Sequence, residues 1–151
     1  MDFENINDDE VKQLIDALKK PTKKFELQKI YDSIQSLPVG NLKSNHAVID
    51  EDNDISYILH QYRGRIGDRY SIHLRFKENN EHLIRVDINP PKHQNPNGEI
   101  INENHLHIYS NKYDKRDAVA IPLSPSEFPN VSEIIKVVTA FMTKTNIVER
   151  K

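Results

Sequence analysis

Apolar residues along the chain repeat at two different spacings. In residues 7–20 they lie three or four positions apart, which is the period of an amphipathic helix. These positions are Val11, Leu14, Ile15 and Leu18. Asn7 and Glu10 match a capping box at the start of this helix, and Pro21 stops it. The pattern therefore predicts a packing helix at 7–20.

The next stretch is less regular. Helical spacing favours a second helix at 23–36, with an edge strand as the alternative, so residues 7–36 are expected to be a helical N-terminal segment. A turn is predicted at 38–41. The polar residues 41–54 are interpreted as a surface loop that includes at most a short strand at 47–49.

From residue 55 onward, apolar and polar residues alternate, which is the period of a half-buried strand. This alternation predicts strands at 55–60, 69–76, 82–89, 105–110 and 118–123. A turn between Gly64 and Gly67 and another near residues 77–80 separate the first of them, and such short connections imply antiparallel neighbours. The histidines at positions 60 and 82 are assigned to the apolar side and interpreted as structural.

A final helix is predicted at 130–145, with Asn130 as its cap and Glu133 three positions later. The expected fold class is therefore α+β: an antiparallel sheet of about four to six strands, spanning residues 47–123, with N-terminal and C-terminal helices packed on one face. A chain of 151 residues suits a single domain, 1–151, with one core.

Composition narrows the classes of function. The net charge of −2 excludes a global basic field, so a nucleic-acid partner would need a local basic patch. The absence of cysteine excludes disulfides, zinc thiolates and thiol nucleophiles. The acidic N-terminus does not resemble a signal peptide, and no apolar run is long enough for a membrane span. We therefore expect a cytoplasmic protein without a membrane partner.

Residues suited to chemistry gather between Asp87 and Tyr109. His105 and His107 alternate on one strand and are expected to share a face with Tyr109, while Asp87 lies on the polar face of the preceding strand. Between the two strands, a loop carries His93 followed by a tight-turn sequence, Asn-Pro-Asn-Gly, that would bring it back over the sheet. The pattern predicts one site containing Asp87, His93, His105 and His107.

Arginines on neighbouring strands are expected to lie on the same polar face. They are Arg69, Arg75 and Arg85, in a stretch (61–85) with six basic and three acidic residues. This local positive bias is compatible with a phosphate-bearing ligand. A solvated face with internal salt bridges is the alternative interpretation.

Three chemical interpretations are compatible with this face. In the first, His105, His107 and Asp87, with His93, bind a divalent metal ion. In the second, no cofactor is needed, because the histidines act as general acid and base while the arginines hold phosphate. In the third, the face only binds a partner and the histidines are structural.

The run from Arg85 through Pro91, His93 and Asn95-Pro96-Asn97-Gly98 to His105-Leu106-His107-Ile108-Tyr109 resembles a family of small uncharacterised bacterial and phage proteins. The resemblance covers roughly residues 55–147. It implies a bacterial or phage origin and a shared domain, with Asp87, His93, His105 and His107 in one site. It implies no activity.

Two functions are expected from these observations. The first is a phosphodiester-cleaving, RNase-like enzyme with RNA as its partner, in which His93, His105, His107 and Asp87 are catalytic. The second is a non-catalytic binding protein from a mobile element, such as an inhibitor of a host nuclease or defence protein. The sequence does not determine the oligomeric state.

Overall fold

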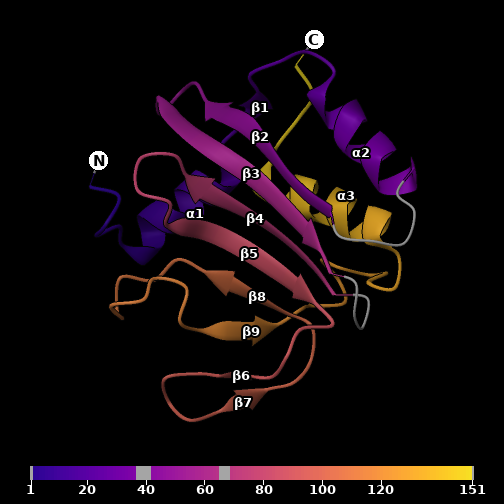
Figure 1. The fold of residues 1–151 in the computed structure, drawn as a ribbon. Helices are drawn as coiled ribbons and strands as arrows, with labels where there is room; N and C mark the ends of the chain where they lie inside the picture. The colour runs from indigo at the N-terminus through magenta and orange to yellow at the C-terminus, as the bar shows by residue number, and fades with distance from the viewer. Residues whose placement is uncertain (1, 37–41, 65–68, 151) are drawn as a thin grey trace.

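The computed structural model describes residues 2–36, 42–64 and 69–150 (Figure 1). The turn predicted at 38–41 lies outside them, and so does most of the one between Gly64 and Gly67. The described residues form three helices: α1 (Asp8–Asp16), α2 (Glu26–Ser36) and α3 (Ile134–Thr145). No described helix is long and apolar enough to span a membrane.

Seven described strands form one antiparallel sheet in the order β1-β2-β3-β4-β5-β8-β9. The strands are β1 (Lys20–Pro21), β2 (Leu42–Asp50), β3 (Ile55–Arg63), β4 (Tyr70–Phe76), β5 (His82–Ile88), β8 (His105–Ile108) and β9 (Ala120–Pro122). A separate hairpin pairs β6 (His93–Gln94) with β7 (Ile100–Ile101). The predicted α+β class is confirmed, and the sheet is wider than four to six strands because β1 and all of β2 join it.

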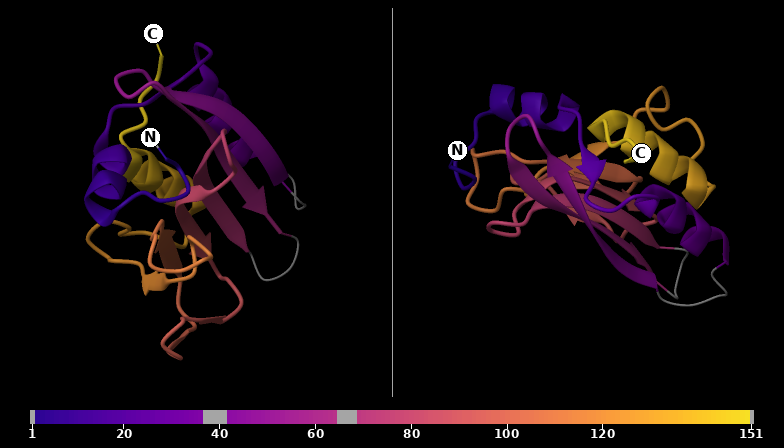
Figure 2. Two further views of the ribbon diagram at one scale, coloured as in Figure 1. Left: turned by 90° about the vertical axis from the view of Figure 1, so that its left-hand side faces the viewer. Right: turned by 90° about the horizontal axis from the view of Figure 1, so that it is seen from above.

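The three helices lie on one side of the sheet, and the N- and C-terminal helices contact each other (Figure 2). Alternate residues of the central strands face these helices and form the core. Examples are Leu59, Ile72, Leu74, Val86 and Leu106, which are all buried. None of the described helices covers the opposite face of the sheet, so this face is open to a ligand.

The first helix begins as predicted but ends earlier. Asn7 and Glu10 form the capping box, whereas the helix stops at Asp16 and Leu18 is 42% exposed. Lys19 is fully buried, and its ammonium donates hydrogen bonds to the carbonyls of Ile15, Ala17 and Thr145 at 2.7–2.9 Å. Burial lowers the pKa of Lys19 to about 8. This one side chain thus caps the C-terminal ends of both α1 and α3.

The interpretation of residues 41–54 as a loop was wrong, because β2 is a nine-residue strand. Its helix-facing side is mostly polar, which removes the period-two apolar pattern. His46 on that side contacts the carboxylate of Glu26 on α2 at 2.7 Å, and Asp50 is buried and accepts hydrogen bonds from Asn53. Polar contacts with other segments, rather than an apolar face, therefore hold β2 in place.

A break in register between β4 and β5 changes which side chains share a face. Leu74 pairs with Ile84, but Arg75 pairs with His82, so Leu83 is an extra residue on β5. Leu83 and Ile84 are both buried in the core, and His82 moves to the open face. Tyr109, predicted to stand beside His107, instead packs in the core next to Leu83, whose carbonyl accepts its backbone N–H.

The C-terminal helix also starts later than predicted. It begins at Ile134, and Glu133 occupies the cap position without a side-chain hydrogen bond to the helix N-terminus. Asn130, expected to be the cap, instead bonds through its amide to the Glu133 carboxylate at 2.9 Å. The helix ends at Thr145, and the left-handed backbone conformation of Asn146 (φ 54°) suits the C-terminal cap that follows it.

Candidate functional site

A cavity of about 460 Å³ opens on the helix-free face of the sheet. Its floor is made by β3, β4, β5 and β8, and the segment from Pro90 to His93 forms a wall. The polar side chains at its surface include Ser71, Asp87 and all of the seven histidines except His46. A pocket of this size suits a small organic ligand or one nucleotide unit.

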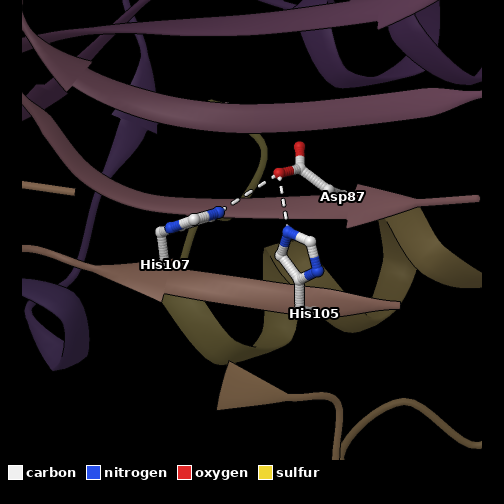
Figure 3. Close-up of side chains that lie close together, drawn as sticks. All are labelled: Asp87, His105 and His107. Atoms are coloured by element: carbon white, nitrogen blue, oxygen red, sulfur yellow. Dashed lines mark ion pairs between the residues drawn. The ribbon is translucent and has the colours of Figure 1, made fainter. Parts of the chain in front are cut away.

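Strand register brings Asp87, His105 and His107 together; we call these residues the Asp87 cluster. Asp87 on β5 lies directly opposite His105 on β8, and His107 is two residues further along the same face. The Asp87 Oδ2 atom is 3.3 Å from Nε2 of His105 and 3.4 Å from Nε2 of His107 (Figure 3). His105 and His107 are only 2% and 1% exposed. The three side chains therefore lie close together, as the sequence predicted.

The other ring nitrogen of each histidine faces a backbone carbonyl. His105 Nδ1 lies 3.0 Å from the carbonyl oxygen of Glu103, and His107 Nδ1 lies 2.7 Å from that of Asp117. A carbonyl only accepts, so both Nδ1 atoms carry the proton of the neutral ring. In neutral rings both Nε2 atoms then present lone pairs to a carboxylate oxygen, and His107 Nε2 has no hydrogen-bond partner among the described residues. Either a metal ion between the three atoms or a proton on one of the two rings would satisfy this arrangement.

Two neighbours hold the Asp87 carboxylate in place. The Ser71 hydroxyl donates to Oδ1 at 2.8 Å, and the Arg85 guanidinium donates to Oδ2 at 3.1 Å. Burial alone would raise the pKa of Asp87, but its contacts with His105 and His107, the charge of Arg85 and the Ser71 hydrogen bond together lower it. Burial lowers the pKa of His107, and Asp87 opposes this only in part. The cluster thus favours an ionised carboxylate and a neutral His107.

His93 closes over the cluster, as the loop sequence predicted. Its ring centre is 4.9 Å from that of His107 and 5.9 Å from that of His105. Its Nε2 donates to the Ala118 carbonyl at 2.7 Å, which leaves the lone pair on Nδ1. Like the two cluster histidines, His93 therefore directs its proton to the backbone and keeps one nitrogen basic.

The buried Asn95 docks this hairpin on the sheet. Its amide accepts a hydrogen bond from the Ala120 N–H at 2.7 Å and donates one to the Ala120 carbonyl at 3.0 Å. Gly98, with φ of 92°, completes the tight turn behind it. Asn95 thus pairs with β9 as a strand residue would, and it positions His93 two residues away.

We expect Asn95→Ala to lower the free energy of unfolding by about 1–3 kcal/mol, because it leaves the buried Ala120 N–H and carbonyl without partners. Urea denaturation followed by circular dichroism measures this loss. Asn102→Ala, which replaces an exposed asparagine after the same hairpin, is the control and should change stability by less than about 0.5 kcal/mol. Equal stabilities for the two variants would contradict the docking role of Asn95.

The three arginines predicted to hold phosphate occupy different environments. Arg69 is exposed and lines the cavity mouth, and the exposed Lys92 of the wall lines the same cavity. Arg85 lines the cavity but bridges two carboxylates, Asp87 and Asp117. Arg75 bonds to His73 and to Asn80, outside the cavity lining. Of the three, Arg69 is the one whose charge faces the cavity without a carboxylate contact among the described residues.

A second group of histidines lies on the same floor. His60, His73 and His82, from β3, β4 and β5, form what we call the imidazole row. The assignment of His60 and His82 to the apolar side was wrong. Ile58 lies on the open face beside His60 and made that face look apolar, and the extra residue Leu83 reverses the orientation of His82.

Asp117 was not identified from the sequence, although it contacts both the Asp87 cluster and the imidazole row. Its carboxylate contacts Arg85 at 2.9 Å and His82 Nδ1 at 3.4 Å, while its backbone carbonyl accepts from His107. The His82 contact and the Arg85 charge outweigh burial and lower the pKa of Asp117. Its position in an irregular polar segment provides no periodic signal.

The fold and site define an α+β protein with a buried histidine–carboxylate group on the open face of an antiparallel sheet. The chain belongs to DUF6978, a family of unknown function, whose model matches residues 6–147. The match reaches further toward the N-terminus than the resemblance noted at 55–147. No curated protein and no solved structure matches the chain.

Proposed function

We propose that this protein is a metal-dependent hydrolase of phosphodiesters, with RNA as its preferred substrate. The observation that carries the proposal is the convergence of two unprotonated Nε2 atoms, from His105 and His107, on one oxygen of Asp87. The three candidate ligand atoms lie within 4.8 Å of one another.

The two distances from Asp87 to the histidines support a metal site. Ligands bound at about 2.0–2.1 Å in a tetrahedral arrangement lie about 3.3 Å apart. The Asp87–His105 and Asp87–His107 separations are 3.3 and 3.4 Å. Three protein ligands leave a coordination position for water or substrate, as in catalytic zinc sites. Nitrogen and carboxylate ligands suit zinc and related divalent transition metals.

The surroundings of the cluster support the same proposal. Histidine ligands of metals ordinarily donate their second N–H to a carbonyl or carboxylate, and ligating carboxylates are themselves hydrogen-bonded. His105 and His107 donate to backbone carbonyls, and Asp87 accepts from Ser71 and Arg85. A metal-free acid–base pair is less favoured, because His105 and His107 are 2% and 1% exposed and both Nε2 atoms face Asp87 rather than the open cavity.

Each polar group then has a part in hydrolysis. A bound metal ion would act as a Lewis acid and lower the pKa of a water molecule. His93 would use its Nδ1 to accept a proton from the attacking water or return one to the leaving oxygen, which its ring position 4.9 Å from that of His107 supports. Arg69 and Lys92 at the cavity mouth would attract the polyanionic substrate.

The test uses protein purified without a metal-chelating tag and treated with EDTA. Zinc, manganese and cobalt are added separately, and cleavage of labelled RNA, labelled DNA and bis(p-nitrophenyl) phosphate is measured. We expect one metal ion per chain and metal-dependent cleavage of RNA that EDTA reverses. Asp87→Asn, which keeps the shape of the side chain, should abolish both.

Two outcomes would overturn the proposal. Stoichiometric metal binding without cleavage of any of the three substrates would reject the enzyme and favour a binding protein. Cleavage that persists in EDTA and in Asp87→Asn would reject the metal-dependent mechanism.

A further inference from the structure

The imidazole row lies in the same cavity as the Asp87 cluster but has a different geometry. His73 stacks on His82 with ring centres 4.0 Å apart and planes inclined by 19°. It also stacks on His60, at 4.9 Å and 29°. Because neighbouring rings cover one another's faces, a ligand meets the ring edges, which carry the nitrogen atoms. The geometry therefore suits hydrogen bonding to a ligand better than stacking of a ligand on a ring.

Hydrogen bonds identify the protonated nitrogen of the central ring. His73 Nε2 lies 3.0 Å from the Arg75 guanidinium, which only donates. The His73 proton is therefore on Nδ1, which has no hydrogen bond to any described residue. His60 Nδ1 lies 2.6 Å from the Asn45 side-chain oxygen, to which it donates, so the Nε2 of His60 is free to accept a proton.

The charges around the row favour an anion. Arg75 has no carboxylate partner among the described residues and bonds to His73. Burial lowers the pKa of His73 to about 2, and the charges of Arg75 and Arg85 act in the same direction. Burial also lowers the pKa of His60, and Arg75 and Lys43 add to this effect. Asp117 is the one carboxylate that contacts the row within the described residues, and it also pairs with Arg85.

We infer that the imidazole row, His60, His73 and His82, is a phosphate-binding subsite that holds a phosphoryl group beside the Asp87 cluster. His73 offers its Nδ1–H to a phosphoryl oxygen, and the Nε2 of His60 becomes a second donor when it takes up a proton with the anion. The charge of Arg75, which bonds to His73, adds attraction although Arg75 does not line the cavity. The positive charge of Arg69, at the mouth of the same cavity, attracts the anion into the cavity. This inference deepens the proposed function, because it assigns substrate binding to residues separate from the metal ligands.

The experiment isolates phosphate binding from metal chemistry. Protein labelled with ¹⁵N is kept in EDTA and titrated with inorganic phosphate in one arm and with dimethyl phosphate in the other, while histidine ring signals are followed by NMR. We expect saturable shifts of the row signals, and at least a tenfold loss of affinity in the double variant His60→Gln/His82→Gln. His46→Gln is the control, since His46 lies on the helix-facing side of β2.

Saturation in both arms assigns the subsite to phosphoryl groups in general, and saturation by dimethyl phosphate alone assigns it to diesters. Shifts without saturation, or equal affinities in the double variant and wild type, would overturn the inference. A double variant that loses the wild-type ring spectrum would be replaced by His60→Gln alone, for which a threefold loss is the minimum expected. No metal ion is present in this experiment. A lack of phosphate binding would therefore not contradict metal-dependent cleavage, and a lack of cleavage in the metal experiment would not contradict phosphate binding.

Discussion

Replacing His107 with glutamine is expected to weaken binding of zinc or cobalt by more than 100-fold and to abolish metal-dependent cleavage. The substitution removes the buried Nε2 atom that faces Asp87 without a hydrogen-bond partner. Removal of an outer-shell partner typically costs about 10–100-fold in metal affinity, so loss of a ligand should cost more. Calorimetric titration of the EDTA-treated protein gives the affinity, and the visible spectrum of bound cobalt reports tetrahedral coordination.

Two matched variants make the comparison specific. Ser71→Ala removes a hydrogen bond to Asp87 but no ligand, and it should lower metal affinity by roughly tenfold. His46→Gln makes the same chemical change as the test variant on the helix-facing side of the sheet, where it should not affect metal affinity. If the His107 variant bound metal as tightly as these two controls, the Asp87 cluster would not be the metal site.

The second large effect is expected in the dependence of stability on pH. Burial lowers the pKa of His73 to about 2, whereas an unfolded histidine has a pKa of about 6.5. Between these values the unfolded chain binds a proton that the folded chain does not, so stability falls as the pH falls below about 6.5. One such group costs about 1.4 kcal/mol per pH unit. From pH 6.5 to 4.5, wild type should therefore lose about 2–3 kcal/mol through His73.

Urea denaturation in phosphate-free buffers at several pH values measures this slope. His73→Gln keeps an acceptor for Arg75 but cannot be protonated, so its stability should fall less steeply over the same range. Asp87 and Asp117 do not confound this window, because their lowered pKa values place the loss of their stabilisation below about pH 4. Parallel curves for wild type and variant would show that His73 is not held neutral by the fold.

The candidate site was only partly predictable. His105 and His107, two positions apart on a strand, must share a face, and the Asn-Pro-Asn-Gly turn predicted that His93 returns over it. Their proximity to Asp87 depends on the register between β5 and β8. The alternation of apolar and polar residues predicted that the three side chains share a face, but it did not fix this register. The proton positions were not predictable, because they depend on the carbonyls of Glu103, Asp117 and Ala118.

Local periodicity by itself determined most of the helical and strand segments, the antiparallel α+β class, and the common face of His105 and His107. These properties depend on neighbours within a few residues, which the sequence displays directly. Only the tertiary structure decided that β2 is a full strand, that Leu83 shifts His82 onto the open face, and that Asn95 fastens His93 beside the cluster. Each of these depends on pairing between segments distant in the chain, and such pairing leaves no period in the sequence.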